Sequence, residues 1–394
     1  MHDIFSHATC RYPFALQQMR GFQRYFPASS HAQGYATSGS GGGFGVDSIQ
    51  SAYGEFIERN HFYLNVHVDK KAFLHEVNSP AVNESLYRMI AQMKSTDQDP
   101  KNYQFNLSKV KNIFDQQDYY LPTALFTLSS FDFVDREFVP FMDSCGEAVH
   151  TSYEKAAQRS LLEFVERQAL VGSWITRTFK YKIDPDVVLN NPRQKKFAEQ
   201  LLRYGEMHVF DVALSVPGYA VIILYFAKSQ QDYVQYAIGM AAGLSPDEAV
   251  SKALNELWLD YGYLYVSQEA WKSLSFIPAS KRYTIRHVED NNVAKTKGIM
   301  AYDLTAACNI SANDFLALPT FTKQTAYEEL KKITPYIFIY HHHDCRKEYE
   351  YTKILSPDLF LHMSVTDKLN VDNAYTRLLK ADLNHLYRNK IPFP

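Results

Sequence analysis

Apolar residues recur with helical spacing in several stretches of the chain. Two of these stretches run from Ser48 to Phe62 and from Tyr153 to Leu170, and a third follows Pro246. Ser245 is suited to cap this third helix, with Pro246 at its first helical position. Because residues at i, i+3, i+4 and i+7 share one helix face, the pattern predicts three long helices, with a further helix over about Pro80 to Ser95.

Between these helices, short stretches alternate apolar and polar residues or are almost entirely apolar, as strands are. The predicted strands are 61–68, 121–128, 137–142, 207–214, 219–227, 233–240, 335–340 and 349–355. A strand, a Gly-containing loop and a helix follow one another at the second and third long helices. The mixture, which no clear linker interrupts, predicts an α+β (mixed) fold in which residues 1–394 form a single domain.

Two segments show neither the helical nor the strand periodicity of apolar residues. Residues 1–47 predict an irregular N-terminal segment, which ends in the Gly-rich run Ser38–Gly45. That run predicts a flexible linker or lid; it is not a P-loop, because no Gly-Lys-Ser/Thr follows it. Residues 265–325 are also predicted to be irregular, as an insertion or a partner-facing segment.

Composition and charge exclude several classes of protein. A net charge of −2 provides no global basic field to recruit nucleic acid or anionic lipid. No apolar run approaches the ~20 residues of a membrane span, and the N-terminus lacks the basic region and apolar core of a signal peptide. The four scattered cysteines (Cys10, Cys145, Cys308 and Cys345) form no Cys-x-x-Cys pair. We therefore expect a cytoplasmic protein without nucleic-acid or membrane partners.

One acidic and basic signature occurs twice within the predicted helices. Gly54–Arg59 has the sequence GEFIER, and Leu162–Arg167 has the sequence LEFVER. In a helix, Glu at i and i+3 and Arg at i+4 share one face. A single copy is usually a solvated face with an ion pair, but the recurrence of the signature among apolar neighbours favours a packed site.

A weaker third copy precedes Glu256. A small residue stands three positions before each lead glutamate; these residues are Ala52, Ser160 and Ala253. We expect them to let the helices approach closely and to aim Glu55, Glu163 and Glu256 at one point. Carboxylates bind Mg²⁺ together with phosphates, and guanidinium groups suit phosphate oxygens, so the copies predict a Mg-nucleotide site.

Other candidate sites carry weaker signals. His341–Cys345 contains three consecutive histidines, but neighbouring side chains of a strand point in alternating directions, so a polar turn is favoured over a transition-metal site. Arg177, Lys353 and His362 are either phosphate or substrate contacts or ordinary surface groups.

The residues above carry a resemblance to the YcaO family. Its three glutamate helices, each preceded by a Gly-containing loop, are similar to Gly45–Arg59, Gly146–Arg167 and Gly243–Tyr261. The ending Ile391–Pro394 resembles the proline-rich ending of the family. The segment Tyr351–Met363 is similar to its counterpart in the cyclodehydratase subunits of microcin B-like synthetases, and the landmarks span nearly the whole chain.

The resemblance implies a Mg-ATP site and the residues that form it. The implied metal and nucleotide ligands are Glu55, Glu58, Glu163, Glu166 and Glu256. Arg59 and Arg167 are implied to act near the phosphates, and the free carboxylate of Pro394 is implied to assist proton transfer. Lys155 stands where the family often has an acidic residue, and Leu259 stands where it often has glutamine. These two replacements put one metal ligand and one nucleotide contact in doubt. Lys390 stands where the family has a proline.

The family resemblance also implies a reaction. Cys, Ser or Thr of a ribosomally made precursor peptide attacks the preceding carbonyl carbon, ATP phosphorylates the resulting oxyanion, and elimination closes a thiazoline or oxazoline ring. Implied partners are the precursor with its leader, a leader-binding subunit and an FMN-dependent azoline dehydrogenase. Two alternatives remain open: another amide activation of this family, giving a thioamide or an amidine, and a degenerate subunit that only presents peptide, for which Lys155 and Leu259 are the best support.

Overall fold

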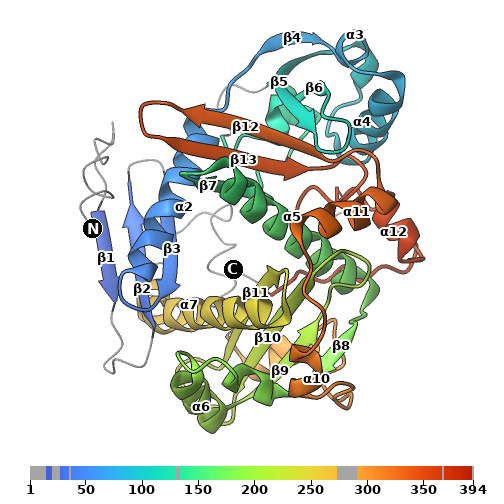
Figure 1. Ribbon diagram of the computed structural model, residues 1–394. Coiled ribbons are helices and arrows are strands. Elements are labelled where there is room, and N and C mark those ends of the chain that lie inside the picture. The colour runs from blue at the N-terminus through green and yellow to red at the C-terminus, as the bar shows by residue number, and fades with distance from the viewer. Residues whose placement is uncertain are drawn as a thin grey trace.

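Three antiparallel sheets and a set of helices make up the parts of the chain that the computed structural model describes, which are residues 15–19, 27–34, 37–129, 134–272, 291–365 and 368–392 (Figure 1). The strands are β1 (Ala15–Met19), β2 (Ala28–Gln33), β3 (Ser38–Gly43), β4 (Lys70–Phe73), β5 (Gln104–Asn112), β6 (Asp118–Pro122), β7 (Glu147–His150), β8 (Tyr181–Ile183), β9 (Gly205–Asp211), β10 (Tyr219–Ala227), β11 (Tyr236–Gly243), β12 (Phe338–Asp344) and β13 (Tyr349–Leu355). The helices are α2 (Asp47–Leu64), α3 (Leu74–Val77), α4 (Pro80–Met93), α5 (Tyr153–Thr176), α6 (Lys195–Tyr204), α7 (Pro246–Lys272), α9 (Val293–Gly298), α10 (Ala312–Leu316), α11 (Lys323–Ile333) and α12 (Ala374–Leu378). The predicted mixed fold is confirmed.

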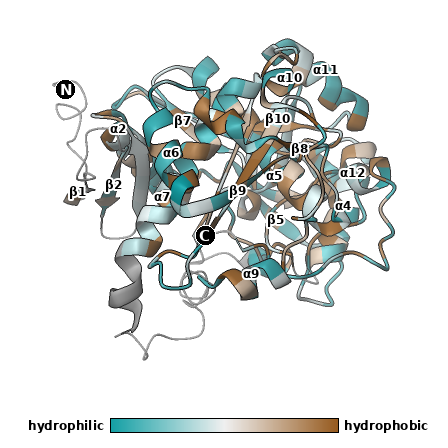
Figure 2. Ribbon diagram, turned by 90° about the horizontal axis from the view of Figure 1, so that it is seen from below, coloured by the Kyte–Doolittle hydropathy of each residue, from teal (hydrophilic) through white to brown (hydrophobic). Residues whose placement is uncertain are grey.

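The sheet with the order β11-β10-β9-β8 is buried on both faces. Every residue of β10 is buried, which explains why the strand is a continuous apolar run rather than an alternating one. Ile222 and Leu224 pack with α5, whereas Val221 and Ile223 face α6 and α7. In Figure 2 this sheet is largely brown, and α6 shows both colours, as an amphipathic helix does.

The sheet with the order β4-β5-β12-β13-β7, with β6 beside β5, packs against α2, α4 and α5. Gly146 makes the turn into β7 with a left-handed φ of 75°, and a Cβ there would lie 2.3 Å from the carbonyl oxygen of Ile354. This glycine therefore lets β7 approach β13 and sets the start of α5.

The Gly-rich run before α2 is a strand, not a flexible linker or lid. β1, β2 and β3 form a three-stranded sheet, so the prediction of an irregular 1–47 segment is wrong for its described part. A Cβ on Gly39 would lie 2.3 Å from the backbone nitrogen of Phe56, and one on Gly41 would lie 2.3 Å from that of Ala52. The glycines are required because β3 lies directly on the backbone of α2.

Other predicted elements also differ from the structure. Residues 61–64 continue α2, so the strand predicted over 61–68 is wrong. The strand predicted over 121–128 ends at Pro122 and continues as a buried turn, and 137–142 contains no strand. These were short apolar runs, whose periodicity does not separate strands from turns.

The segment predicted as an insertion over 265–325 is part of the core where it is described. Met300, Ala301 and Tyr302 pack in the cluster on the α5 side of the sheet, and Phe315 packs in the cluster on its α7 side. Residues 273–290 lie outside the described residues. The other predicted helices and strands are found close to their predicted positions, whereas elements such as β5, β8 and α6 were not predicted. At the start of α7 the backbone N–H of Glu248 donates to Ser245 Oγ at 3.3 Å, as expected for the predicted cap.

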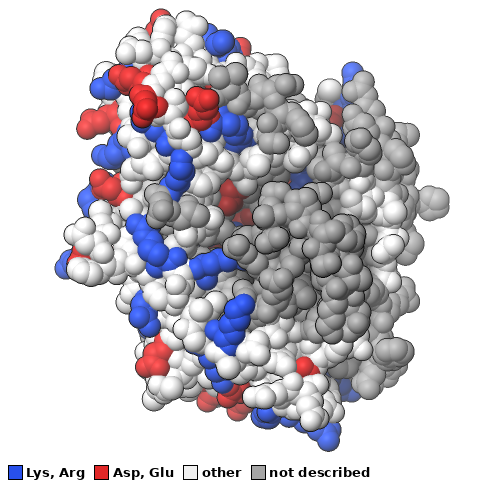
Figure 3. All heavy atoms as spheres, turned by 180° about the vertical axis from the view of Figure 1, so that it is seen from behind, with Lys and Arg blue, Asp and Glu red and all other residues white. Residues whose placement is uncertain are grey.

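The surface carries both signs of charge. Figure 3 shows Lys and Arg side chains interspersed with Asp and Glu on the described part of the face opposite to Figure 1, as expected for a net charge of −2. No helix within the described ranges is both long and apolar enough to cross a membrane.

Candidate functional site

The first signature places Glu55, Glu58 and Arg59 on one side of α2. Arg59 Nη2 lies 2.5 Å from Glu55 Oε1, the ion pair expected at i,i+4. The other oxygen of Glu55 accepts a hydrogen bond from the backbone N–H of Ser40 in β3. The Gly-rich strand therefore fixes the lead glutamate of the first helix.

The second signature lies on α5 and contacts the end of β11. Arg167 lies 3.8 Å from Glu163 Oε1 and 3.4 Å from Glu166 Oε1. The backbone N–H of Ala242 donates to Glu166 Oε2 at 3.2 Å. Because β11 leads directly into α7, this bond ties the second glutamate helix to the start of the third.

Glu256 projects from α7, and its side chain stays accessible to solvent although the surrounding elements desolvate its carboxylate. α7 lies on β11, where a Cβ on Gly239 would be 2.1 Å from the carbonyl oxygen of Ala253. One turn later, the buried carboxylate of Asp260 accepts a hydrogen bond from the backbone N–H of Ile238 at 2.9 Å. Helix and strand are therefore fixed to each other on both sides of Glu256.

The five predicted glutamates form a closed ring of mutually repelling carboxylates, which we call the carboxylate ring. Beyond the effect of burial, Glu55 raises the pKa of Glu58, and Glu58 and Glu166 raise that of Glu163. Glu166 and Glu55 likewise raise the pKa of Glu256, so the contacts run from α2 to α5 to α7 and back to α2. Figure 1 shows α2, α5 and α7 on three sides of the centre of the molecule. The structure thus brings together what the sequence predicted to converge.

Burial is the largest cause of the raised pKa values in the ring. It acts with Glu147 and Glu55 to raise the pKa of Glu58 to about 8, and with Glu166 and Glu55 to raise the pKa of Glu256 to about 8. Burial also raises the pKa of Glu166, and raises that of Glu163 well above its usual range, although Arg167 opposes both shifts. Desolvated carboxylates that repel one another need a cationic ligand in order to be charged together.

Arg167 is the cation at the centre of the second signature. Burial would lower its pKa, but Glu166, Cys145, Glu163 and Asp143 together raise it above its usual value. Its guanidinium also donates to the sulfur of Met363 at 3.5 Å. Arg167 therefore keeps its charge at every working pH.

The ring fits a Mg-nucleotide better than a bare metal ion. No three Asp, Glu, His or Cys side chains in the described parts of the chain are close enough to enclose a metal ion. The carboxylates therefore surround a space rather than form a closed cage. Mg²⁺ usually takes only one or two carboxylates and completes its shell with water and substrate phosphates.

Lys353, predicted to be a phosphate or substrate contact or a surface group, is buried and forms an ion pair beside the ring with Glu147, which was not predicted. Lys353 Nζ lies 3.0 Å from Glu147 Oε1 and donates to the carbonyl oxygen of Asp143 at 2.7 Å. Burial raises the pKa of Glu147 to about 7 in spite of Lys353, and Glu147 in turn acts on Glu58 and Glu163. Lys353 and Glu147 meet through the pairing of β13 with β7, so no local signal in the sequence could have revealed the ion pair.

The two departures from the family pattern have different surroundings. Lys155 is exposed in the first turn of α5. Leu259 packs on β3, since a Cβ added to Gly42 would lie 2.7 Å from the Cγ atom of Leu259. An apolar residue at 259 thus packs against the Gly-rich strand.

The remaining candidates lie elsewhere. His341 and His343 point to one side of β12, where both lie within 3.1 Å of Glu350, and His342 stacks on His61. The expected alternation is therefore present, but the predicted polar turn is wrong for the three histidines, which lie in β12; the turn begins at Cys345. Arg177 is exposed and lies over the ring of Tyr387, as a surface group can, whereas His362 is buried against Phe141 and is not a surface group.

Pro394 lies outside the described residues. The described chain before it is anchored by hydrogen bonds: Trp174 Nε1 donates to the carbonyl oxygen of Asn389 at 2.7 Å, and the Tyr236 hydroxyl donates to that of Pro392 at 3.0 Å. Ile391 belongs to the core cluster around α5.

Three sheet-backed glutamate helices, two of which also carry an arginine paired with their glutamates, define a protein that binds Mg-nucleotide. Residues 42–333 match the family model described as YcaO cyclodehydratase, ATP- and Mg²⁺-binding. The chain belongs to this family, so the predicted enzyme class and the predicted ATP and Mg²⁺ are confirmed.

Known proteins similar to this chain cover almost its whole length. The microcin B17-processing protein McbD of Escherichia coli is 26% identical over 389 residues, 95% of each chain. Two structures of the E. coli microcin synthetase McbBCD complex match 98% of both chains, with a TM-score of 0.86 at 24% identity and, with pro-MccB17 bound, 0.84 at 25%. YcaO from Methanopyrus kandleri bound with AMPPCP and Mg²⁺ matches 88% of this chain and 85% of that chain, with a TM-score of 0.57 at 11% identity.

Proposed function

We propose that this chain is the ATP-dependent cyclodehydratase subunit of a microcin B-like synthetase. It forms thiazoline and oxazoline rings from Cys, Ser and Thr residues of a ribosomally made precursor peptide. The observation that carries the proposal is the carboxylate ring, in which three helices gather negative charges that only a cationic ligand makes favourable. Support comes from the family and from the similarity to McbD over 95% of both chains.

Each ring closure consumes one ATP. The thiol or hydroxyl of the substrate loses its proton and attacks the carbonyl carbon of the preceding residue. The resulting oxyanion takes the γ-phosphoryl group, and ADP leaves. The amide nitrogen then gives up its proton, a C=N bond forms, and the oxygen departs as inorganic phosphate.

We assign the ring to the nucleotide and its metal. Glu55, Glu58, Glu163, Glu166 and Glu256 bind Mg²⁺ and ATP. Mg²⁺, when bound, neutralises phosphate charge during the transfer. Arg59 and Arg167 stabilise the transferring oxygens, and Arg167 suits this role because its neighbours keep it charged.

The proton transfers need a general base, for which the carboxylate of Pro394 is our candidate. The support is the resemblance of the Pro-Phe-Pro ending to the family pattern. The hydrogen bonds to the carbonyl oxygens of Asn389 and Pro392 are consistent with a tail that is held in a fixed place.

The proposed partners are the precursor peptide with its leader, a leader-binding subunit and an FMN-dependent azoline dehydrogenase. The E. coli relative was solved as a complex with pro-MccB17 bound. We further propose a cytoplasmic location, where ATP is available. Cys145, Cys308 and Cys345 are free thiols, as is usual in a reducing compartment.

Intact-mass spectrometry of the precursor tests the proposal. With its partner subunits and Mg-ATP, the chain should remove one water per ring formed, and Glu163→Ala should abolish both this loss and Mg-dependent ATP binding. Glu199→Gln, an exposed glutamate on α6, is the control and should behave as wild type. An unchanged mass with nucleotide bound and all partners present would contradict ring formation and favour another amide activation or a presenting subunit.

A further inference from the structure

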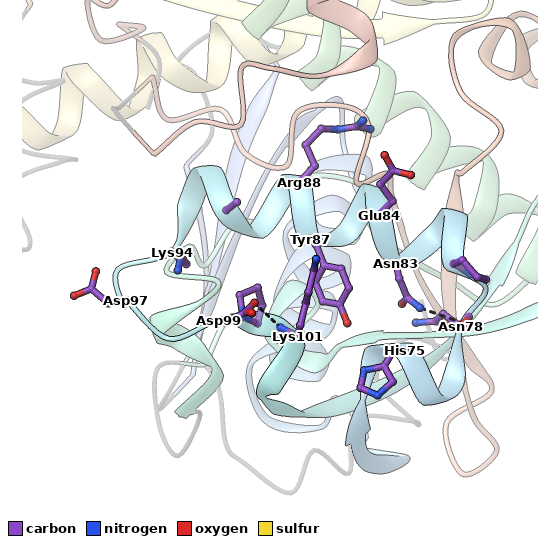
Figure 4. Close-up of a pocket in the computed structure, with 13 residues that line it drawn as sticks. His75, Asn78, Asn83, Glu84, Tyr87, Arg88, Lys94, Asp97, Asp99 and Lys101 are labelled. Carbon is purple, nitrogen blue, oxygen red and sulfur yellow. Dashed lines mark hydrogen bonds between the residues drawn. The ribbon is translucent and has the colours of Figure 1, made fainter.

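A polar cavity of about 760 Å³ runs along the outer side of α4. Its walls come from α4, from the residues that precede it and from the 94–101 turn, and no member of the carboxylate ring lines it. Figure 4 shows Asn83 and Tyr87 of α4 on the same side of the helix as His75 and Lys101. A volume of this size is typical of ligand pockets.

Two buried polar atoms on this wall lack partners. Asn83 is only 5% exposed, and its Nδ2 donates to the carbonyl oxygen of Asn78 at 3.2 Å. That bond fixes the amide, and Oδ1 is left without a hydrogen bond to any described residue. One turn later the buried hydroxyl of Tyr87 lies near the backbone of His75 but makes no hydrogen bond of ordinary geometry within the described chain. Because leaving a buried polar atom without a hydrogen bond is unfavourable, two such atoms on adjacent turns indicate an occupant.

The charges around the cavity disfavour an anion as that occupant. Arg88 pairs with Asp358 at 2.7 Å, Lys94 donates to the carbonyl oxygen of Gln98 at 3.0 Å, and Lys101 lies over the Tyr87 ring at 5.7 Å. The acidic residues that also line the cavity are Glu84, Asp97 and Asp99. With cations already engaged and carboxylates on the rim, the wall suits a neutral ligand that offers both a donor and an acceptor.

We propose that this cavity binds an extended segment of the precursor peptide through its main chain. Asn83 Oδ1 accepts a hydrogen bond from a peptide N–H, and the Tyr87 hydroxyl donates to a peptide carbonyl oxygen. One dipeptide unit of a main chain offers both an N–H donor and a carbonyl acceptor, and neither group is charged. The proposal rests on the proposed function, since it takes a peptide as the substrate.

The cavity is held in a fixed position relative to the catalytic helix. Arg88 and Gln92 of α4 bind Asp358 and Asp372 of the segment that follows β13. The same segment is bound to α5, since Phe360 exchanges two hydrogen bonds with Gln168, the residue after Arg167. A peptide docked on α4 would therefore lie in a fixed position relative to the carboxylate ring. A docking site remote from the reacting residue needs such a fixed position.

Fluorescence anisotropy with labelled, overlapping peptides that tile the precursor tests this docking site on the full-length chain, without ATP. At least one tile should bind, and Tyr87→Phe should weaken it about 3- to 10-fold, the effect of one neutral hydrogen bond. N-methylation of the bound tile should weaken it similarly. Because the Tyr87 hydroxyl has no partner of ordinary geometry among the described residues, its removal should not lower the melting temperature.

Tyr375→Phe is the matched control. It also removes a buried hydroxyl, which lies near the backbone of Ser215 without a hydrogen bond of ordinary geometry in the described chain. Tyr375 belongs to the cluster around α5 rather than to the cavity, so its replacement should leave peptide affinity unchanged. The proposal is overturned if no tile binds, or if every tile binds wild type and Tyr87→Phe equally. It is also overturned if Tyr87→Phe impairs only assembly with the partner subunits, since the occupant is then a subunit. Mg-ATP binding, measured separately, reports on the proposed function without affecting this result.

Discussion

Replacing Glu58 by glutamine tests whether the carboxylate ring is destabilising when it is empty. Burial and the charges of Glu147 and Glu55 raise the pKa of Glu58 from 4.5 to about 8, against the opposing effects of Arg59 and Arg159. Glutamine keeps the shape of the side chain and removes its charge. We therefore expect Glu58→Gln to stabilise the ligand-free protein at pH 7 and to weaken Mg-dependent ATP binding.

The sign and size follow from proton linkage. Between pH 4.5 and about 8, folded Glu58 holds its proton when the unfolded chain has lost it, so this group lowers stability as pH rises. At pH 7 the loss is at most about 3 kcal/mol, from about 1.4 kcal/mol per pH unit. Because water reaches part of the Glu58 side chain, we expect a gain of about 1–2 kcal/mol in the variant. Near pH 4.5 the gain should almost vanish.

Urea unfolding of the ligand-free protein at pH 7 and pH 4.5 measures this gain, and calorimetry measures ATP binding. Glu199→Gln removes an exposed glutamate of α6 and should change stability by less than about 0.5 kcal/mol at either pH. Affinity for Mg-ATP should fall at least about tenfold in Glu58→Gln, as expected when one charged ligand group is lost. If Glu58→Gln destabilises the protein at pH 7, or has the same effect at both pH values, the reasoning about the ring is wrong.

The remaining predictions concern the framework around the ring. Lys353→Met leaves the buried carboxylate of Glu147 without its cationic partner and should lower the free energy of unfolding by about 3–5 kcal/mol, as measured by urea unfolding. Adding Glu147→Gln should restore most of this loss. Gly39→Ala places a Cβ 2.3 Å from the backbone of α2 and should lower both the melting temperature and ATP affinity; Gly54→Ala, on the open side of the same helix with no described atom within 4 Å of its Cβ, should instead stabilise by up to about 1 kcal/mol. Residues added after Pro394 should impair turnover in the mass assay and leave ATP binding intact, and full activity of a tagged chain would refute the role of the terminal carboxylate.

The long elements could be predicted because their patterns are long. α5 and α7 present apolar residues over many turns, and β10 is apolar throughout because both of its faces are covered. The prediction failed at 61–64, where His61 stacks on Tyr351 from a strand far along the chain. This contact determines that His61 is buried, and no short stretch of sequence around His61 contains its partner.

The repetition of a short signature revealed the candidate site better than any single motif could. The two copies supply Glu55, Glu58, Glu163 and Glu166, and the structure places all four beside Glu256. Their proximity was predictable, and their roles as ligands stay predictions. Glu147 could not be found, because its significance depends on strand pairing with Lys353 across the whole middle of the chain.

The small residues before the lead glutamates serve a purpose that differs from the predicted one. They bring each helix onto a strand rather than onto another helix. The contacts are Ala52 with β3 at Gly39 and Gly41, Ser160 with β13 at Thr352, and Ala253 with β11 at Gly239. Since each contact lies one turn from its glutamate, the helix backbones cannot shift apart to relieve the repulsion within the ring. The fold therefore retains an arrangement that is unfavourable when empty and favourable around a cationic ligand, which is the preorganisation that phosphoryl transfer requires.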